Sequence, residues 1–95
     1  MYISNILHFL DESGNIPKEM PKEGREMAGF LVLVIDSATQ AQNKSLVRCF
    51  EQGCSGEIQS VITGNEISWK CSRCENEGRI SGWQKTKWDN RKLTI

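Results

Sequence analysis

The placement of four cysteines constrains this chain more than any other feature of its sequence. They form two pairs in the second half, Cys49 with Cys54 and Cys71 with Cys74, and 16 residues separate the pairs. A structural Zn²⁺ takes four thiolates in a tetrahedron, each about 2.3 Å from the ion. A turn between two closely spaced cysteines can aim both sulfur atoms at one point, and a separate hairpin can supply the second pair. The spacing therefore predicts one structural Zn²⁺ bound by Cys49, Cys54, Cys71 and Cys74.

Other uses of these cysteines remain open from the residues alone. Two disulfides would require an oxidising compartment, but residues 1–10 contain no Lys or Arg and no small-residue cleavage site, which predicts a cytoplasmic protein. A redox Cys-x2-Cys motif usually opens a helix in a thioredoxin-like βαβ unit, and no such pattern is visible. The remaining alternatives are iron in the same four ligands or no metal at all. A catalytic zinc is disfavoured, because four protein ligands leave no position for water.

The second half has too few apolar residues to fold readily without a metal ion or a disulfide. The chain has 95 residues, 38% of them hydrophobic and 25% charged, which is typical of one small domain and not of a disordered chain. Residues 41–95 contain 14 apolar residues besides the cysteines. Structural zinc supplies about 10–16 kcal/mol of apparent binding energy in small modules, and this energy drives folding. The longest apolar run, 28–35, is far shorter than the about 20 residues of a membrane span, so we expect no membrane partner.

The first half, residues 1–40, has the pattern of helices. Four apolar residues recur at the spacing of one helical face, and turn residues follow them; the four are Ile3, Ile6, Leu7 and Leu10. A second helix is predicted to start near Pro21, because proline fits the first helical turn. A strand over 30–35 is the alternative, since that run is apolar and β-branched. The helical spacing continues beyond both ends of the run and favours the helix.

The second half, residues 41–95, is typical of short strands and turns. Strands are predicted over 45–50, 57–62, 66–70 and 79–83, each bounded by Gly, Asn or Ser. Residues 63–65, Thr-Gly-Asn, have the composition of a hairpin loop, because Gly and Asn tolerate positive φ. The sequence therefore predicts an α+β fold, in which an N-terminal helical segment (1–40) packs on a small antiparallel zinc-ribbon-like β module (41–95).

The sequence also resembles a known group of proteins over most of its length. The resemblance rests mainly on the four cysteines and on the pairs Gly82-Trp83 and Trp88-Asp89, and the patterns of 6–21 and 28–31 are also similar. By these residues the chain resembles small uncharacterised bacterial proteins with a helical N-terminal half and a zinc-ribbon-like C-terminal half. The resemblance implies a bacterial cytoplasmic protein with a zinc ribbon, and it implies no established activity.

One position departs from the pattern of this group. Such motifs commonly carry Gly directly after the last cysteine, where a positive φ is needed, and this chain has Glu75 there. The resemblance then implies that the turn is either deformed or made with Asn76.

The residues expected of an enzyme are sparse. The single histidine, His8, lies on an apolar helical pattern, and the serine and threonine hydroxyls have no visible base partner. The glycines at 53 and 56 are not followed by the Lys-Ser/Thr pair that a phosphate loop needs. The sequence therefore predicts a non-enzymatic binding module with no small-molecule substrate.

Nucleic acid is one partner that the sequence leaves open. Residues 41–95 hold nine basic and six acidic residues, and near the C-terminal end basic side chains interleave with tryptophan. Lysine neutralises phosphates, and exposed tryptophan stacks on unpaired bases. The candidate nucleic-acid-binding residues are Lys85, Lys87, Trp88, Arg91 and Lys92. Trp69 and Trp83 have an alternative role, because a small β module needs large side chains in its core.

A protein-interaction or adaptor role is the favoured prediction, with a protein partner or self-association. The candidate partner face is the apolar face of the second predicted helix, formed by Met27, Phe30, Leu31, Val34 and Ile35. The same face could instead cover the β module of its own chain. Phosphate contacts weaken steeply with salt whereas an apolar protein interface does not, so salt dependence separates the two functions.

Overall fold

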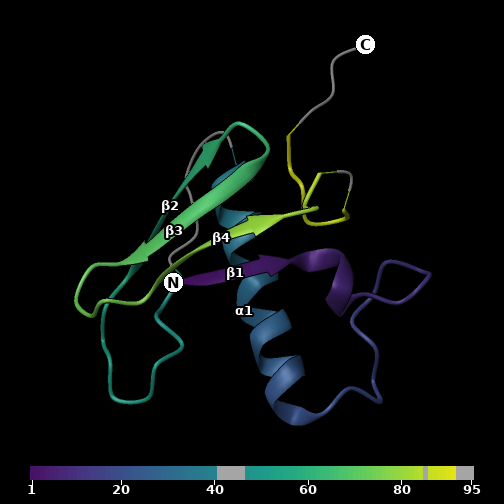
Figure 1. The fold of residues 1–95 in the computed structure, drawn as a ribbon, viewed down its shortest axis with the longest axis horizontal. Coiled ribbons are helices and arrows are strands. Elements are labelled where there is room, and N and C mark those ends of the chain that lie inside the picture. Colours follow the sequence, from purple (N-terminus) through teal and green to yellow (C-terminus); the bar gives the residue numbers. More distant parts are fainter. Residues whose placement is uncertain (41–46, 85, 92–95) are drawn as a thin grey trace.

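One α-helix packs on one face of a four-stranded sheet, which gives the chain an α+β fold (Figure 1). The computed structural model describes residues 1–40, 47–84 and 86–91. In chain order the elements are β1 (Tyr2–Asn5), the 3₁₀ turn η1 (Ile6–Phe9), α1 (Lys22–Thr39), β2 (Ile58–Thr63), β3 (Glu66–Cys71) and β4 (Glu77–Ser81). None of the helices in these residues has the length and apolar character that crossing a bilayer requires.

The sheet is mixed, with the strand order β1-β4-β3-β2. β2 and β3 form the predicted hairpin, in which a turn of two residues includes Gly64 with a φ of 61°. β4 runs antiparallel to β3, with Ile80 opposite Ile67. β1 pairs with β4 in parallel, with Tyr2 opposite Gly78. The strands of the second half therefore pair antiparallel, as predicted, and the sheet is mixed because β1, from the segment predicted to be helical, adds a parallel strand.

The start of the chain is a strand and not the predicted helix. The apolar residues of 3–10 do not share a buried face: Ile6 is fully buried, whereas Ile3 and Leu7 are 71% and 54% exposed. Pairing with β4 satisfies the backbone groups of β1 in place of a helix. The Asn5 side chain then accepts a hydrogen bond from the Leu7 N–H and starts the 3₁₀ turn. The one α-helix of the described residues lies mid-chain rather than at the N-terminus.

The second predicted helix is confirmed as α1, and it forms one side of the core. Its first turn carries Glu23, which suits the positive end of the helix dipole. Four residues of the candidate partner face are buried against the sheet, and Met27 packs at the edge of the core; the four are Phe30, Leu31, Val34 and Ile35. This face therefore covers the chain's own sheet, so it is not available to a partner. Residues from both predicted segments, 1–40 and 41–95, share this core.

The strands predicted in the second half are confirmed with small shifts, except the first. β2, β3 and β4 correspond to the predictions over 57–62, 66–70 and 79–83. Residues 45 and 46 lie outside the described residues, and 47–50 contribute only an isolated bridge between Arg48 and Glu57. β4 ends earlier than predicted, because Gly82 has a φ of 71° and turns the chain so that Trp83 enters the core.

Gly78 allows three strands to approach closely beside an aromatic stack. It lies between Tyr2 on β1 and Trp69 on β3, in one row across the sheet. The two rings stack with their centroids 6.0 Å apart and 24° between their planes. A Cβ atom at residue 78 would lie 2.5 Å from the Tyr2 carbonyl oxygen and 2.8 Å from the Trp69 indole. The buried Trp69 Nε1 has no hydrogen-bond partner among the described residues, so packing holds this ring.

Gly78→Ala is expected to destabilise the fold by about 1–3 kcal/mol, the usual cost of overpacking, because the new Cβ forces β1 away from β4. Gly29→Ala is the matched control, since a Cβ at that position of α1 meets nothing within 4 Å. Alanine also favours a helix over glycine by about 1 kcal/mol. Urea unfolding followed by circular dichroism measures both variants. An unchanged midpoint for Gly78→Ala would contradict the close approach of β1.

Candidate metal centre

The four cysteines converge at one end of the sheet. Cys49 and Cys54 lie in the loop before β2, Cys71 is the last residue of β3, and Cys74 lies in the turn to β4. Their Sγ atoms all lie within 4.8 Å of one another. Cys49 Sγ is 3.7 Å from Cys74 Sγ, and Cys54 Sγ is 3.6 Å from Cys71 Sγ. The predicted grouping of the four residues is therefore confirmed.

Two of the distances between the sulfur atoms match the edge of a tetrahedral metal site. Four sulfurs placed about 2.3 Å from a Zn²⁺ lie about 3.8 Å apart, because a tetrahedron's edge is about 1.6 times its centre-to-corner distance. The two short Sγ–Sγ distances, 3.6 and 3.7 Å, match that edge. All four thiols are free. Four sulfur ligands are a donor set for zinc or iron, and they close the coordination of a tetrahedral ion.

Backbone N–H groups point at the sulfur atoms from both loops. The N–H groups of Arg73 and Cys74 donate to Cys71 Sγ at 3.4 Å each. The Gly56 N–H donates to Cys54 Sγ at the same distance. Hydrogen bonds of this kind favour a thiolate over a thiol. The local backbone is therefore arranged for negatively charged sulfur, which is the form that binds a metal ion.

The same environment separates the pKa values of the thiols. The N–H groups of Cys74 and Arg73 lower the pKa of Cys71 from 9.0 to about 6. The backbone hydrogen bond of Asn76 lowers the pKa of Cys74, but burial and the neighbouring sulfurs together outweigh it and raise this pKa to about 12. Burial and the Cys71 sulfur likewise raise the pKa of Cys54 against the lowering effect of the Gly56 N–H.

These shifts have opposite consequences for stability. The lowered pKa of Cys71 gives a contribution that is complete above pH 9.0, declines as the pH falls, and is lost below about 6. The raised pKa of Cys74 gives a contribution that is complete below pH 9.0 and is lost as the pH rises through about 12. At neutral pH the thiol protons that remain are the ones a metal ion must displace.

Gly56 provides the space that the Cys71 sulfur occupies. A Cβ atom at residue 56 would lie 2.4 Å from Cys71 Sγ and 3.1 Å from the Arg73 backbone nitrogen. This functional residue was not predicted from the sequence. The available signal was a glycine two residues after a metal-ligating cysteine, where the backbone has to approach sulfur closely.

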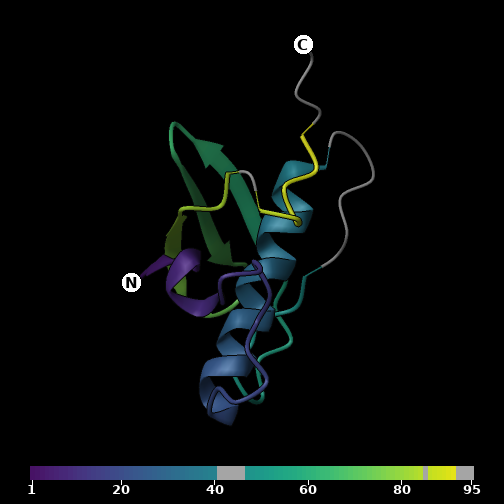
Figure 2. The same ribbon diagram turned by 90° about the vertical axis from the view of Figure 1, so that its right-hand side faces the viewer.

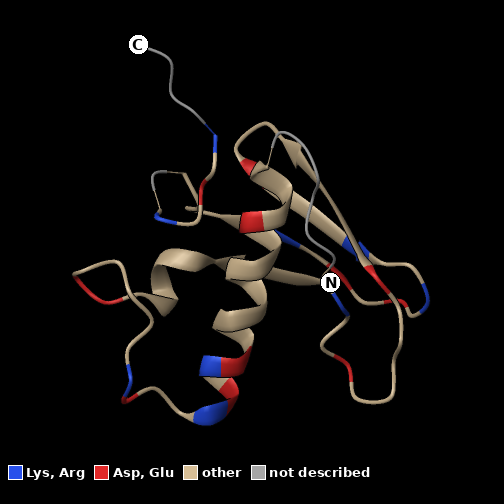
Figure 3. Ribbon diagram, turned by 180° about the vertical axis from the view of Figure 1, so that it is seen from behind, with Lys and Arg blue, Asp and Glu red and all other residues tan. Residues whose placement is uncertain are grey.

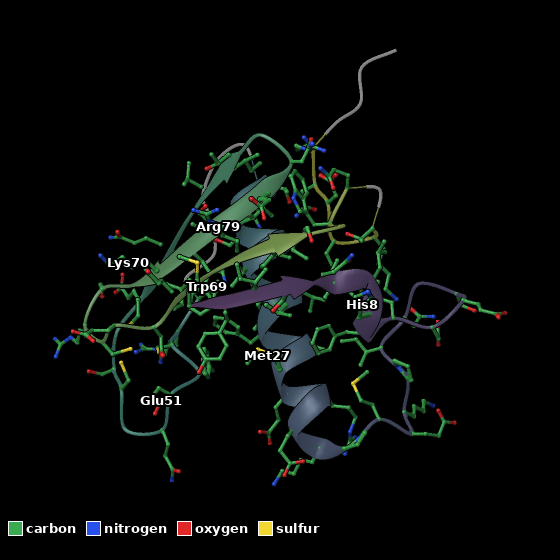
Figure 4. The ribbon with its side chains drawn as sticks, in the orientation of Figure 1. His8, Met27, Glu51, Trp69, Lys70 and Arg79 are labelled. Atoms are coloured by element: carbon green, nitrogen blue, oxygen red, sulfur yellow. The ribbon has the colours of Figure 1, made fainter. Side chains whose placement is uncertain are left out.

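Asn76 takes part in the turn that lacks the expected glycine. Its carbonyl accepts a hydrogen bond from the Cys71 N–H at 2.9 Å. Its side-chain amide lies 3.9 Å from Cys49 Sγ and donates to Glu51 Oε2 at 3.5 Å (Glu51 is labelled in Figure 4). Asn76 thus joins the turn after β3 to the loop that carries the first cysteine pair.

Phe50 anchors that first loop in the core. Its ring centroid lies 4.8 Å from Phe30 on α1 and 5.4 Å from Tyr2 on β1, in edge-to-face contacts. Trp69 completes the cluster, 5.0 Å from Phe30 and 6.0 Å from Phe50. Aromatic pairs contribute about 0.5–1.5 kcal/mol each beyond the area that they bury. Because Phe50 follows Cys49 directly, the candidate metal centre is packed against the helix and the sheet together.

The described candidate nucleic-acid-binding residues make contacts within the chain. Lys87 donates a hydrogen bond to Asn15 Oδ1, and its Nζ lies 5.2 Å from the Trp88 ring. Trp88 itself packs against the core. The Arg91 guanidinium lies over the Trp83 ring at 4.3 Å. Trp83 is fully buried, which confirms the core role that the sequence offered as the alternative.

The segment after β4 docks on the C-terminal end of α1 (Figure 2). The Asn90 N–H donates to Thr39 Oγ1 at 2.9 Å, and the Asn90 side-chain amide donates to Asp36 Oδ1 at 2.7 Å. These hydrogen bonds hold the segment to the last turn of the helix. Two further candidates for nucleic-acid binding, Lys85 and Lys92, lie outside the described residues.

A comparison with known protein families, curated proteins and solved structures found no match to this chain. The resemblance to small bacterial proteins and the zinc-ribbon-like character of the β module therefore stay predictions from the sequence. The assignment of the four cysteines as a candidate metal site rests on their geometry alone.

Gly56→Ala is expected to weaken Zn²⁺ binding about 10–100-fold, the usual effect of disturbing the groups that orient metal ligands. The added methyl would push Cys71 Sγ away from the other three sulfurs. Ser55→Ala is the control, because the neighbouring Ser55 is exposed. Competition with a chromophoric chelator measures both affinities. Equal affinities in the two variants would contradict the role of Gly56.

Zinc-loaded protein is expected to leave the fluorescence anisotropy of labelled single- and double-stranded DNA unchanged at low salt. The physical reason is that Lys87 and Arg91 are already engaged by Asn15 and Trp83. A saturable rise in anisotropy that falls with salt and is reduced by Lys87→Ala would contradict this expectation and support nucleic-acid binding.

Proposed function

We propose that this chain is a non-enzymatic protein-interaction module whose fold is stabilised by one structural Zn²⁺ bound to Cys49, Cys54, Cys71 and Cys74. The observation that carries the metal assignment is the group of four sulfurs with edges of 3.6 and 3.7 Å. Four protein ligands are typical of structural zinc and leave no coordination position for water or substrate. The metal would then fix the shape of the two loops and the end of the sheet.

The distribution of charge supports a protein partner over a polyanion. The chain has 12 basic and 12 acidic residues. Figure 3 shows basic and acidic positions intermingled along the described part of the chain. The surface also keeps large aliphatic side chains exposed, among them Ile3, Leu33 and Val61. An interaction surface of mixed charge with aliphatic contacts fits a folded protein better than it fits phosphates.

Protein purified under reducing conditions is expected to contain one zinc per chain by mass spectrometry of the metal. Excess EDTA is expected to abolish the cooperative thermal transition, and added zinc to restore it. The reason is that structural zinc contributes about 10–16 kcal/mol, which matches or exceeds the about 5–15 kcal/mol of net stability of typical proteins. Cys74→Ser should lower the zinc content in the same assay.

A metal-free preparation with a cooperative melt that EDTA does not change would overturn the proposal. One iron per chain in place of zinc would correct the identity of the metal and leave the structural role of the site.

A further inference from the structure

The face of the sheet opposite α1 carries side chains that neither the metal centre nor the core uses. Side chains alternate along each strand, so one set faces the core and the other faces away from α1. We call the second set the open face; it consists of Ile3, Gln59, Val61, Ser68, Lys70, Glu77 and Arg79. A groove of about 510 Å³ crosses it and is lined in part by these residues. Figure 4 labels Lys70 on β3 and Arg79 on the neighbouring β4.

One row of the open face has aliphatic ends and a polar centre. The strand register places Ile3, Arg79, Ser68 and Val61 side by side, on β1, β4, β3 and β2 in that order. Ile3 and Val61, at the two edges of the sheet, are 71% and 58% exposed. The row therefore presents an aliphatic contact at each side of the sheet.

The next row of the open face carries opposite charges side by side. Glu77 on β4 is opposite Lys70 on β3, and Gln59 on β2 follows. Lys70 makes no ion pair within 4.0 Å with any described residue. Arg79 in the first row has a long and exposed ion pair with Glu66 at 3.9 Å. The open face thus carries both signs of charge, which opposes binding of a polyanion.

The two rows are complementary to themselves about a two-fold axis. A two-fold axis parallel to the strands, between β4 and β3, would relate two such sheets packed face to face. About this axis β1 of one copy faces β2 of the other, so Ile3 meets the second copy's Val61. β4 likewise faces β3, so Glu77 meets the second copy's Lys70. Each contact occurs twice, as the symmetry of such an interface requires.

We propose that this chain forms a two-fold dimer in which the open faces of two sheets pack against each other. The inference rests on the proposed function and deepens it, since it names a second copy as the partner. Burial of the Ile3 and Val61 side chains of both copies supplies the hydrophobic contribution to the free energy of dimerisation. The two Glu77–Lys70 pairs across the interface set its register, as complementary charges do at protein interfaces.

Sedimentation equilibrium of zinc-loaded, reduced protein from micromolar to millimolar concentration tests the dimer. Val61→Asp should weaken it about tenfold or more, because it places a carboxylate against the second copy's Ile3. Leu33→Asp on the outer surface of α1 is the matched control, since Leu33 is 57% exposed and Val61 is 58% exposed. The control should leave the dimer unchanged. Circular dichroism and zinc content are measured on each sample.

A mixing experiment tests the register of the interface. Lys70→Glu places a second carboxylate against Glu77 across its own homodimer, and Glu77→Lys places two ammonium groups in contact in the same way. Both homodimers should therefore be weakened. An equimolar mixture should dimerise again, because each contact in the heterodimer joins a carboxylate to an ammonium group. The charge pairs within each chain are the same before and after mixing. Recovery of the dimer on mixing therefore reports the contact between the two copies.

A zinc-loaded, cooperatively folded protein that stays monomeric throughout would overturn the dimer and leave the zinc module of the proposed function intact. A dimer that Leu33→Asp weakens and Val61→Asp does not would also overturn the inference, because it would place the interface on α1. A mixture that dimerises no better than its two components would overturn the proposed register. Loss of zinc from the sample would count against the proposed function instead.

Discussion

The convergence of four sulfur atoms at one end of the sheet is the constraint around which the rest of the structure is arranged. It brings together the loop before β2 and the turn between β3 and β4, which are also joined by hydrogen bonds between Glu57 and Ser72. Phe50 follows Cys49 and packs against Phe30 on α1 and Tyr2 on β1. The Phe50 side chain thereby connects the sulfur group to the helix and to β1. The candidate metal site and the hydrophobic core act as one structural unit.

Glycine makes two of the closest approaches in this unit possible. At Gly56 the backbone passes the Cys71 sulfur, and at Gly78 it passes the stacked rings of Tyr2 and Trp69. Neither residue has a positive φ, so the requirement is for space and not for an unusual backbone conformation. A small chain with few apolar residues gains packing density at such points, because its large side chains lie directly against backbone.

Much of the fold and the metal site could be predicted from the sequence, because the signals were local. The cysteine spacing located the sulfur group, the helical period located α1, and the Thr-Gly-Asn loop located the β2–β3 hairpin. β1 could not be predicted, because its pairing partner lies near the other end of the chain and its residues carry a misleading helical period. Lys87 and Arg91 look like free surface cations in the sequence, and only the fold brings Asn15 and Trp83 to them.

The parallel pairing of β1 with β4 has a consequence for the order in which the molecule folds. Tyr2 is opposite Gly78, so β1 has no partner among the described strands until β4 has been synthesised. The β2–β3 hairpin has only neighbouring residues to bring together, and such local contacts form faster than distant ones. The hairpin and the cysteine loops can thus form before β1 is paired. Docking of β1 beside Gly78 is therefore expected to follow the formation of the hairpin, because β4 is the only described strand with which β1 pairs.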